Sequence, residues 1–168
     1  MGTLFQRQLA IYASYHRDPH NRATHFIGIP AIVFSLLVPL ALWRIPVGGL
    51  DLSAAWFVAA VEVAGWVLLD WSIGLAMLIV MVPMLLIADW IGANFPVGAS
   101  WLIFVTFFAV GWAFQLVGHH FEGRRPALVD NLFQAFIGPM FIMAETLLAL
   151  GLRRDLKPIV EDAESRTV

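Results

Sequence analysis

The five histidines of this chain fall in two short polar stretches and are the residues best suited to chemistry. The stretches are YASYHRDPHNRATH (12–25) and GHHFE (118–122), and the long segment between them has no histidine. The histidines are His16, His20, His25, His119 and His120. Imidazole binds Zn, Fe, Cu and Ni and titrates near neutral pH. One histidine at a membrane boundary needs no function, but five in two segments favour a metal site.

Helical spacing ranks the histidines of the first stretch. Asp18 followed by Pro19 is typical of a helix start, with an N-cap and then proline at the first helical position. Counted from there, Asn21 and His25 are four residues apart and share a face, whereas His20 points about 100° away from Asn21. His16 closes the preceding helix.

The second stretch has a polar stripe of its own. Gln115, His119 and Glu122 are spaced i, i+4 and i+7, which aligns an amide, an imidazole and a carboxylate if the helix runs that far. His120 lies off this stripe. The sequence therefore predicts a metal site with His16, His25 and His119 at its core, Glu122 as a ligand or an orienting group, and His20 and His120 as further candidate ligands.

The donor set narrows the choice of metal. The chain has no cysteine, which excludes disulfides, thiolate metal sites and a cysteine nucleophile. Histidine and carboxylate without sulfur suit non-haem Fe(II) or Zn. Arg124 and Arg125 follow Glu122 closely and either anchor the chain at the membrane surface or hold an anionic head group.

Composition indicates that these residues belong to a membrane protein. Hydrophobic residues make up 60% of the 168 and charged ones 13%, and the mean hydropathy is +0.80. A spanning helix needs about 20 apolar residues. Five runs approach that length, at 24–43, 52–70, 71–91, 97–117 and, with more polar residues, 128–151.

We expect an all-α fold, a polytopic transmembrane helical bundle with four to five spans and an N-terminal interfacial helix near 4–16. Residues 1–152 would form one membrane-embedded domain and 153–168 a solvated C-terminal tail. The segment RIPVGGLD (44–51) reads as a turn. With a net charge of −2 and no large basic patch, nothing indicates nucleic-acid binding.

Topology predicts that the two histidine stretches meet. If the first four runs all cross the membrane, both stretches emerge on the same side. Five arginines lie on that side, at 7, 17, 22, 124 and 125, against Arg44 on the other, so the positive-inside rule makes this face cytoplasmic. A fifth full crossing at 128–151 would put the basic tail on the opposite side, a conflict that re-entry at Gly138-Pro139 would remove.

Together the motifs resemble the Mpo1-like family of membrane proteins. The resemblance rests on YASYHRDPHNRATHFIGIP, WAFQLVGHHFEGRRPAL and QAFIGPMFIMAETLLALG, and it spans nearly the whole chain. By position it covers His16, Asn21, His25, Gly28, Pro30, Gln115, Gly118, His119, Glu122, Pro126 and Glu145.

This resemblance implies an Fe(II)-dependent dioxygenase of fatty-acid α-oxidation, which shortens a 2-hydroxy fatty acid by one carbon with O₂. Its partners would be that lipid, O₂ and the bilayer. In such an enzyme Asn21, Gln115 or Glu122 would orient ligands or move protons, and Arg124 or Arg125 would hold the substrate carboxylate.

Two other functions fit the same residues. One is a zinc-dependent membrane lipid hydrolase, and the other is a non-enzymatic protein, either a haem carrier with histidine axial ligands or a scaffold. For location we expect a bacterial inner membrane rather than the endoplasmic reticulum. The sequence leaves the oligomeric state open.

Overall fold

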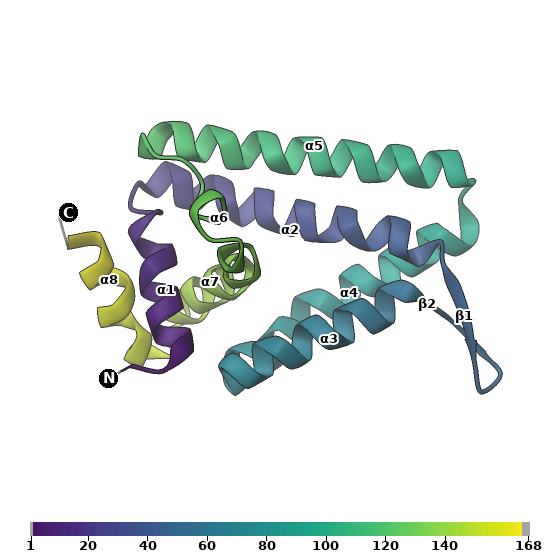
Figure 1. Ribbon diagram of the computed structural model, residues 1–168, viewed down its shortest axis with the longest axis horizontal. Coiled ribbons are helices and arrows are strands. Elements are labelled where there is room, and N and C mark those ends of the chain that lie inside the picture. The colour runs from purple at the N-terminus through teal and green to yellow at the C-terminus, as the bar shows by residue number, and fades with distance from the viewer. Residues whose placement is uncertain (1, 166–168) are drawn as a thin grey trace. The chain divides into compact units, whose positions relative to one another are not determined.

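The computed structural model describes residues 2–165, with side chains through Glu161, and within them it is helical apart from one short hairpin (Figure 1). The elements run in the order α1 (Leu4–Ser14), α2 (Pro19–Ala41), β1 (Arg44–Val47), β2 (Leu50–Ser53), α3 (Ala54–Leu69), α4 (Trp71–Asn94), α5 (Val97–Glu122), α6 (Ala127–Asp130), α7 (Phe133–Ala149), η1 (Arg154–Leu156) and α8 (Lys157–Ser165).

The chain divides into two compact units. One contains the residues up to Ile29 together with those from Ala113 onward, and the other contains Pro30–Trp112. Helices α2 and α5 each contribute to both units. All five histidines belong to the first unit, which is therefore the one that carries the candidate site.

The first unit is held together by an apolar stripe on α1. Phe5, Leu9 and Tyr12 recur at helical spacing and are buried. Thr3 and Gln6 form a capping box that fixes the start of the helix. Helix α1 contacts both α7 and α8, and α1 and α8 lie side by side in Figure 1.

The C-terminal segment is ordered as far as the structure describes it. Of the 153–168 region, in which we expected a solvated tail, residues 154–165 form η1 and α8. Leu156 and Val160 are buried, because α8 packs on α1. Residues 166–168 lie outside the described residues.

The second unit is built on the pair α3 and α4, which lie side by side (Figure 1). The break between them is at Asp70, as the sequence predicts, and the Asp70 carboxylate accepts hydrogen bonds from the backbone N–H groups of Ser72 and Ile73 at 3.2 and 3.1 Å. A Cβ on Gly74 would lie 2.4 Å from the Val67 backbone nitrogen, so the close packing requires glycine.

The expected turn at 44–51 is part of a two-stranded antiparallel hairpin. Gly48 and Gly49 make its tip, both with positive φ, which glycine adopts without strain. Arg44 pairs with Asp51 inside the hairpin and joins the hairpin to α4 through Asp89, with Nη1 2.7 Å from the Asp89 carboxylate.

By length and composition, the structure supports a helical membrane protein with three to four candidate spans, a range that includes four and does not test the fifth. Within residues 2–165, three helices are long and apolar enough to cross, namely α2, α4 and α5. Helix α7 together with the segment Arg154–Glu161 would make a fourth, bent by 114°. Helix α3 has 16 residues, fewer than the ~20 that a span requires.

Candidate metal centre

The start of α2 sets the positions of the first two candidate ligands. Asp18 caps the helix as predicted, because its Oδ1 accepts hydrogen bonds from the backbone N–H groups of His20 at 2.7 Å and Asn21 at 3.3 Å. His16 stands just before the cap and His25 lies in the second turn. A short loop and a helix start thus supply two imidazoles.

Helix α5 approaches this part of α2 at Gly118. A Cβ there would lie 2.2 Å from Thr24 Oγ1 and 2.5 Å from Asn21 Oδ1, closer than any side chain allows. Glycine lets the two backbones approach, and the next residue, His119, comes to lie beside His25. The predicted meeting of the two histidine stretches is thereby confirmed for these residues.

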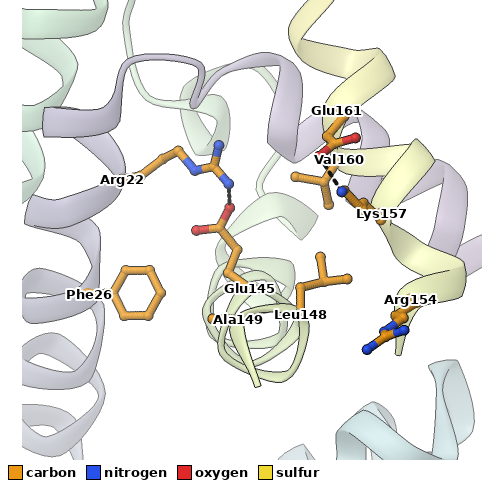
Figure 2. Close-up of a pocket in the computed structure, with 9 residues that line it drawn as sticks. All are labelled: Arg22, Phe26, Glu145, Leu148, Ala149, Arg154, Lys157, Val160 and Glu161. Atoms are coloured by element: carbon orange, nitrogen blue, oxygen red, sulfur yellow. Dashed lines mark hydrogen bonds and ion pairs between the residues drawn. The ribbon is translucent and has the colours of Figure 1, made fainter. Parts of the chain in front are cut away.

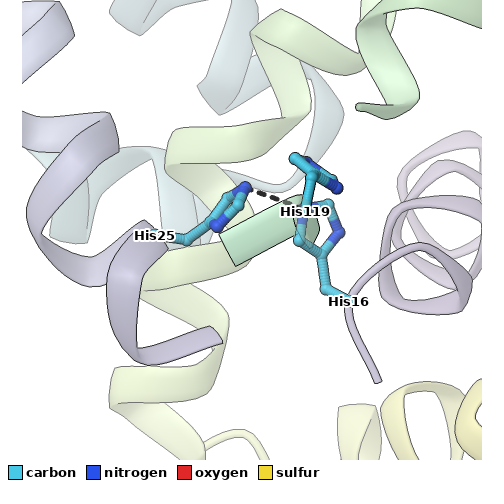
Figure 3. Close-up of side chains that lie close together, drawn as sticks. All are labelled: His16, His25 and His119. Atoms are coloured by element: carbon cyan, nitrogen blue, oxygen red, sulfur yellow. Dashed lines mark hydrogen bonds between the residues drawn. The ribbon is translucent and has the colours of Figure 1, made fainter. Parts of the chain in front are cut away.

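His16, His25 and His119 form a compact buried cluster, which we call the triad (Figure 3). One possible ligand atom from each ring lies within 4.8 Å of the others. The three residues are 1%, 1% and 6% exposed, in chain order. Their centroids are separated by 4.4 to 5.1 Å.

Hydrogen bonds to the backbone orient two of the rings. Nδ1 of His16 is 2.7 Å from the carbonyl oxygen of Tyr12, and Nδ1 of His25 is 2.8 Å from that of Asn21. A carbonyl oxygen only accepts, so each Nδ1 carries the hydrogen when the ring is neutral. Each Nε2 is then left with a lone pair.

These two lone pairs point at each other, because Nε2 of His16 lies 3.0 Å from Nε2 of His25. Two neutral rings of this tautomer repel, and a cation between them relieves the repulsion. Metal–nitrogen bonds are about 2.1 Å long, so one ion could reach both nitrogens at this separation. His119 Nδ1 is buried and has no hydrogen-bond partner among the described residues. The triad therefore fits a metal ion.

Aromatic packing encloses the His16 ring. Tyr12 stacks on it with ring centroids 4.1 Å apart and planes 5° from parallel, and Phe141 of α7 lies 5.6 Å away. Burial lowers the pKa of His16 well below its ordinary value, and the charges of His25, His119 and Arg22 lower it further, against the hydrogen bond to Tyr12. The ring is thus held neutral, the form that binds metals.

Glu122 supports the triad from outside it. Its carboxylate accepts hydrogen bonds from the backbone N–H groups of Arg17 at 3.0 Å and Asp18 at 2.9 Å, and from Asn21 Nδ2 at 2.9 Å. Asn21 also donates to the carbonyl of Tyr15 at 3.2 Å. Glu122 and Asn21 therefore tie the loop that bears His16 to the ends of α2 and α5.

Gln115 shares the buried face of α5 with His119. The side chain is 7% exposed, and its Nε2 has no hydrogen-bond partner among the described residues. An unpaired amide donor in a buried position is costly, which leaves this group available to a ligand.

His20 and His120 lie outside the triad. Both are exposed, and each packs on Phe121, with centroids 5.2 and 6.3 Å from that ring. His20 also bonds to Asp18 at 3.1 Å. The division made by helical spacing, with these two histidines off the main face, matches their positions.

The two consecutive arginines after α5 contact neighbouring polar and aromatic groups. Arg124 lies over the ring of Tyr15, 3.6 Å from its centroid, while Arg125 forms an ion pair with Asp130. Tyr15 in turn donates to Asp130 at 2.9 Å. These contacts form an exposed cluster beside the α1–α2 loop.

Two features near the triad were not predicted from the sequence. Tyr12 precedes His16 by one helical turn, a spacing that could have indicated the stacking. Arg22 forms an ion pair with Glu145, which is 8% exposed, and these residues are 123 positions apart (Figure 2). No local sequence pattern predicts this ion pair.

Two comparisons with known proteins, by family model and by sequence identity, give the same family. The family model for 2-hydroxy-palmitic acid dioxygenase Mpo1-like proteins matches residues 3–150. The 2-hydroxy-palmitic acid dioxygenase MPO1 of Saccharomyces cerevisiae is 34% identical over 161 residues, covering 92% of this chain and 86% of the yeast protein. No solved structure matches the chain.

Proposed function

Because the chain belongs to the Mpo1-like family, we propose that it is an Fe(II)-dependent dioxygenase that shortens 2-hydroxy fatty acids by one carbon. The observation that carries the proposal is the triad, three buried imidazoles whose possible ligand atoms lie within 4.8 Å of one another. His16, His25 and His119 would hold the iron. Bound Fe(II) would supply the redox chemistry that couples O₂ to cleavage of the C1–C2 bond.

The reaction balances without a further reductant. One 2-hydroxy acid and one O₂ yield the acid shortened by one carbon, CO₂ and water. The C1–C2 bond breaks, C2 is oxidised to the new carboxyl carbon and C1 leaves as CO₂. The protein therefore has to bind an acyl chain, orient its first two carbons at the triad and exclude water.

The composition of the triad suits an anionic substrate. All three candidate ligands are neutral, and the carboxylate of Glu122, one turn beyond His119 on α5, is engaged by backbone N–H groups of the loop. A divalent ion held this way keeps its full positive charge, which attracts a carboxylate or an ionised hydroxyl. The buried site also strengthens that attraction.

We assign supporting roles to the polar residues around the triad. Asn21 and Glu122 would keep the His16 loop in place, and Gln115 would donate a hydrogen bond to the substrate or pass a proton. Arg124 and Arg125 would draw the anionic head group toward this surface. In our proposal the surface is the cytoplasmic face of a bacterial inner membrane, because most arginines near the spans lie on that side.

Product analysis after iron loading tests the proposal. The purified protein is reconstituted with Fe(II) under anaerobic conditions, mixed with 2-hydroxypalmitate and exposed to O₂. We expect pentadecanoic acid together with O₂ consumption. Absence of the C15 acid from iron-loaded protein would refute the dioxygenase assignment.

The same preparation separates the two rival functions. A zinc hydrolase would contain zinc, consume no O₂ and cleave an ester lipid. A haem carrier would show a Soret absorption band in the purified protein. Elemental analysis and one absorption spectrum distinguish these outcomes.

A further inference from the structure

A pocket of about 650 Å³ lies between the first turns of α2, the end of α7 and α8 (Figure 2). This volume is within the range of small-molecule sites. Phe26, Leu148 and Val160 contribute apolar walls, and charged side chains line the rest. An amphiphile with a charged head matches such a mixture.

The charged residues of the pocket leave an excess of positive charge. Arg22, Arg154 and Lys157 are basic, against the two carboxylates of Glu145 and Glu161. Arg22 is compensated by its ion pair with Glu145, and Lys157 lies 3.5 Å from Glu161. The hydrogen bond described for Arg154 goes from its Nε to a neutral acceptor, the carbonyl oxygen of Gly151, at 3.0 Å. The pocket therefore favours an anion near Arg154 and Lys157.

The pocket adjoins the triad along two helices. Arg22 precedes His25 by three residues of α2, so the two side chains share a helix face. On α7, Glu145 follows Phe141 by one turn, and the Phe141 ring lies 5.6 Å from that of His16. Two residues that line the pocket are thus each about one helical turn along the chain from the triad or from its aromatic packing.

We propose that this pocket binds the carboxylate end of the fatty acid, with Arg154 and Lys157 as the contacting cations that select acids over uncharged acyl lipids. The inference rests on the proposed function for the identity of the substrate. It places the head-group contact on η1 and α8, and not at Arg124 and Arg125, which are engaged by Tyr15 and Asp130.

Binding without turnover tests this assignment. Full-length protein in phosphatidylcholine nanodiscs is titrated under anaerobic conditions with 2-hydroxypalmitate and with hexadecane-1,2-diol, its uncharged analogue. Arg154→Gln should weaken binding of the acid about tenfold, the usual order for loss of a charge-assisted hydrogen bond. Binding of the diol should not change.

A second substitution, expected to strengthen acid binding, distinguishes a charge effect from structural damage. Glu161 has a side chain 58% exposed, so Glu161→Gln should preserve the fold while removing a negative charge and releasing Lys157. We expect the acid to bind about threefold more tightly, as is usual for one exposed charge. Arg7→Gln, an exposed change on α1 away from the pocket, is the control and should alter neither ligand.

The results separate this inference from the proposed function. If Arg154→Gln and Glu161→Gln keep the wild-type preference for the acid over the diol, the pocket is not the carboxylate site, whether or not the enzyme produces pentadecanoic acid. Loss of the preference in Arg124→Gln instead would place the head group at the exposed cluster.

A phospholipid phosphate has the same anionic chemistry and is the other possible occupant. Replacing phosphatidylcholine by phosphatidylglycerol would then weaken acid binding in the wild type and in Arg7→Gln but not in Arg154→Gln. That pattern would overturn the assignment to the fatty acid. Equal weakening in all three proteins, from general repulsion at the disc surface, would support it.

Discussion

His16 and His25 face each other through Nε2 atoms 3.0 Å apart, while each Nδ1 is directed at a backbone carbonyl. The pair has more acceptors than hydrogens to satisfy them. A metal ion removes that mismatch, so the hydrogen-bond pattern around the two rings itself indicates a cation site.

Removing a triad ligand should abolish metal binding. We expect His16→Ala, His25→Ala and His119→Ala to retain little iron after purification, because two remaining ligands bind weakly. Elemental analysis of the purified variants gives the readout. The exposed histidines supply matched controls, so His20→Ala and His120→Ala should keep wild-type metal content. Iron retained in all three triad variants would exclude the site.

Glu122→Gln should loosen the loop that carries His16. The amide offers one acceptor oxygen where the carboxylate offers two, and its NH₂ group opposes the backbone N–H groups of Arg17 and Asp18. We expect a loss of about 1–3 kcal/mol in unfolding free energy and a ten- to hundredfold weaker affinity for the metal. Metal titration and thermal unfolding in detergent measure the two effects.

The exposed change Glu161→Gln is the control for that experiment, because it alters charge equally without contacting the loop. Metal affinity in this variant should equal that of the wild type. An unchanged affinity in Glu122→Gln as well would mean that the loop holds His16 without the carboxylate.

Gly118→Ala should destabilise the protein by about 1–3 kcal/mol, because the added methyl group overlaps Thr24 Oγ1 and Asn21 Oδ1. Gly98 is the matched control on the same helix, since a Cβ there has no atom within 4 Å. Gly98→Ala should be neutral or stabilising by up to ~1 kcal/mol, through helix propensity. Melting temperatures of both variants test this, and equal shifts would contradict the close crossing.

Acid should destabilise the metal-free protein. Burial lowers the pKa of His16 in the folded state, whereas the unfolded side chain titrates near its ordinary value of about 6.5. Above that pH both states are neutral and the stability is fully present. Below it the unfolded state binds the proton first, so unfolding free energy falls by up to about 1.4 kcal/mol per pH unit for this one group.

The measurement is a set of unfolding curves between pH 5 and 8 in the presence of a chelator. His16→Gln should be less stable at pH 8 and show a shallower slope below pH 6.5. An equal slope in the variant would assign the acid sensitivity to other groups.

Local sequence pattern was sufficient for those parts of the site that depend on local geometry. The cap at Asp18, the shared face of Asn21 and His25, and the break at Asp70 each follow from residue type and helical spacing, and the structure has all three. Exclusion of His20 and His120 from the main face follows from the same periodicity.

What could not be predicted depends on contacts between distant segments. Glu122 binds backbone N–H groups, which every residue possesses, so no sequence signal marks its partners. The ion pair of Arg22 with Glu145 and the packing of α8 on α1 likewise form only after distant segments come together. The number of spans stays a prediction, because α3 is apolar but shorter than the other candidate helices.

The hydrogen bonds between the α1–α2 loop and Glu122 also affect the order in which the site forms during synthesis. His16 and His25 leave the ribosome early, whereas His119 and Glu122 follow about a hundred residues later. Until α5 has been inserted, the nascent chain offers only two imidazoles on an untethered loop. The triad that would hold a metal is therefore complete only after α5 has been inserted, so we expect metal to bind late in biogenesis.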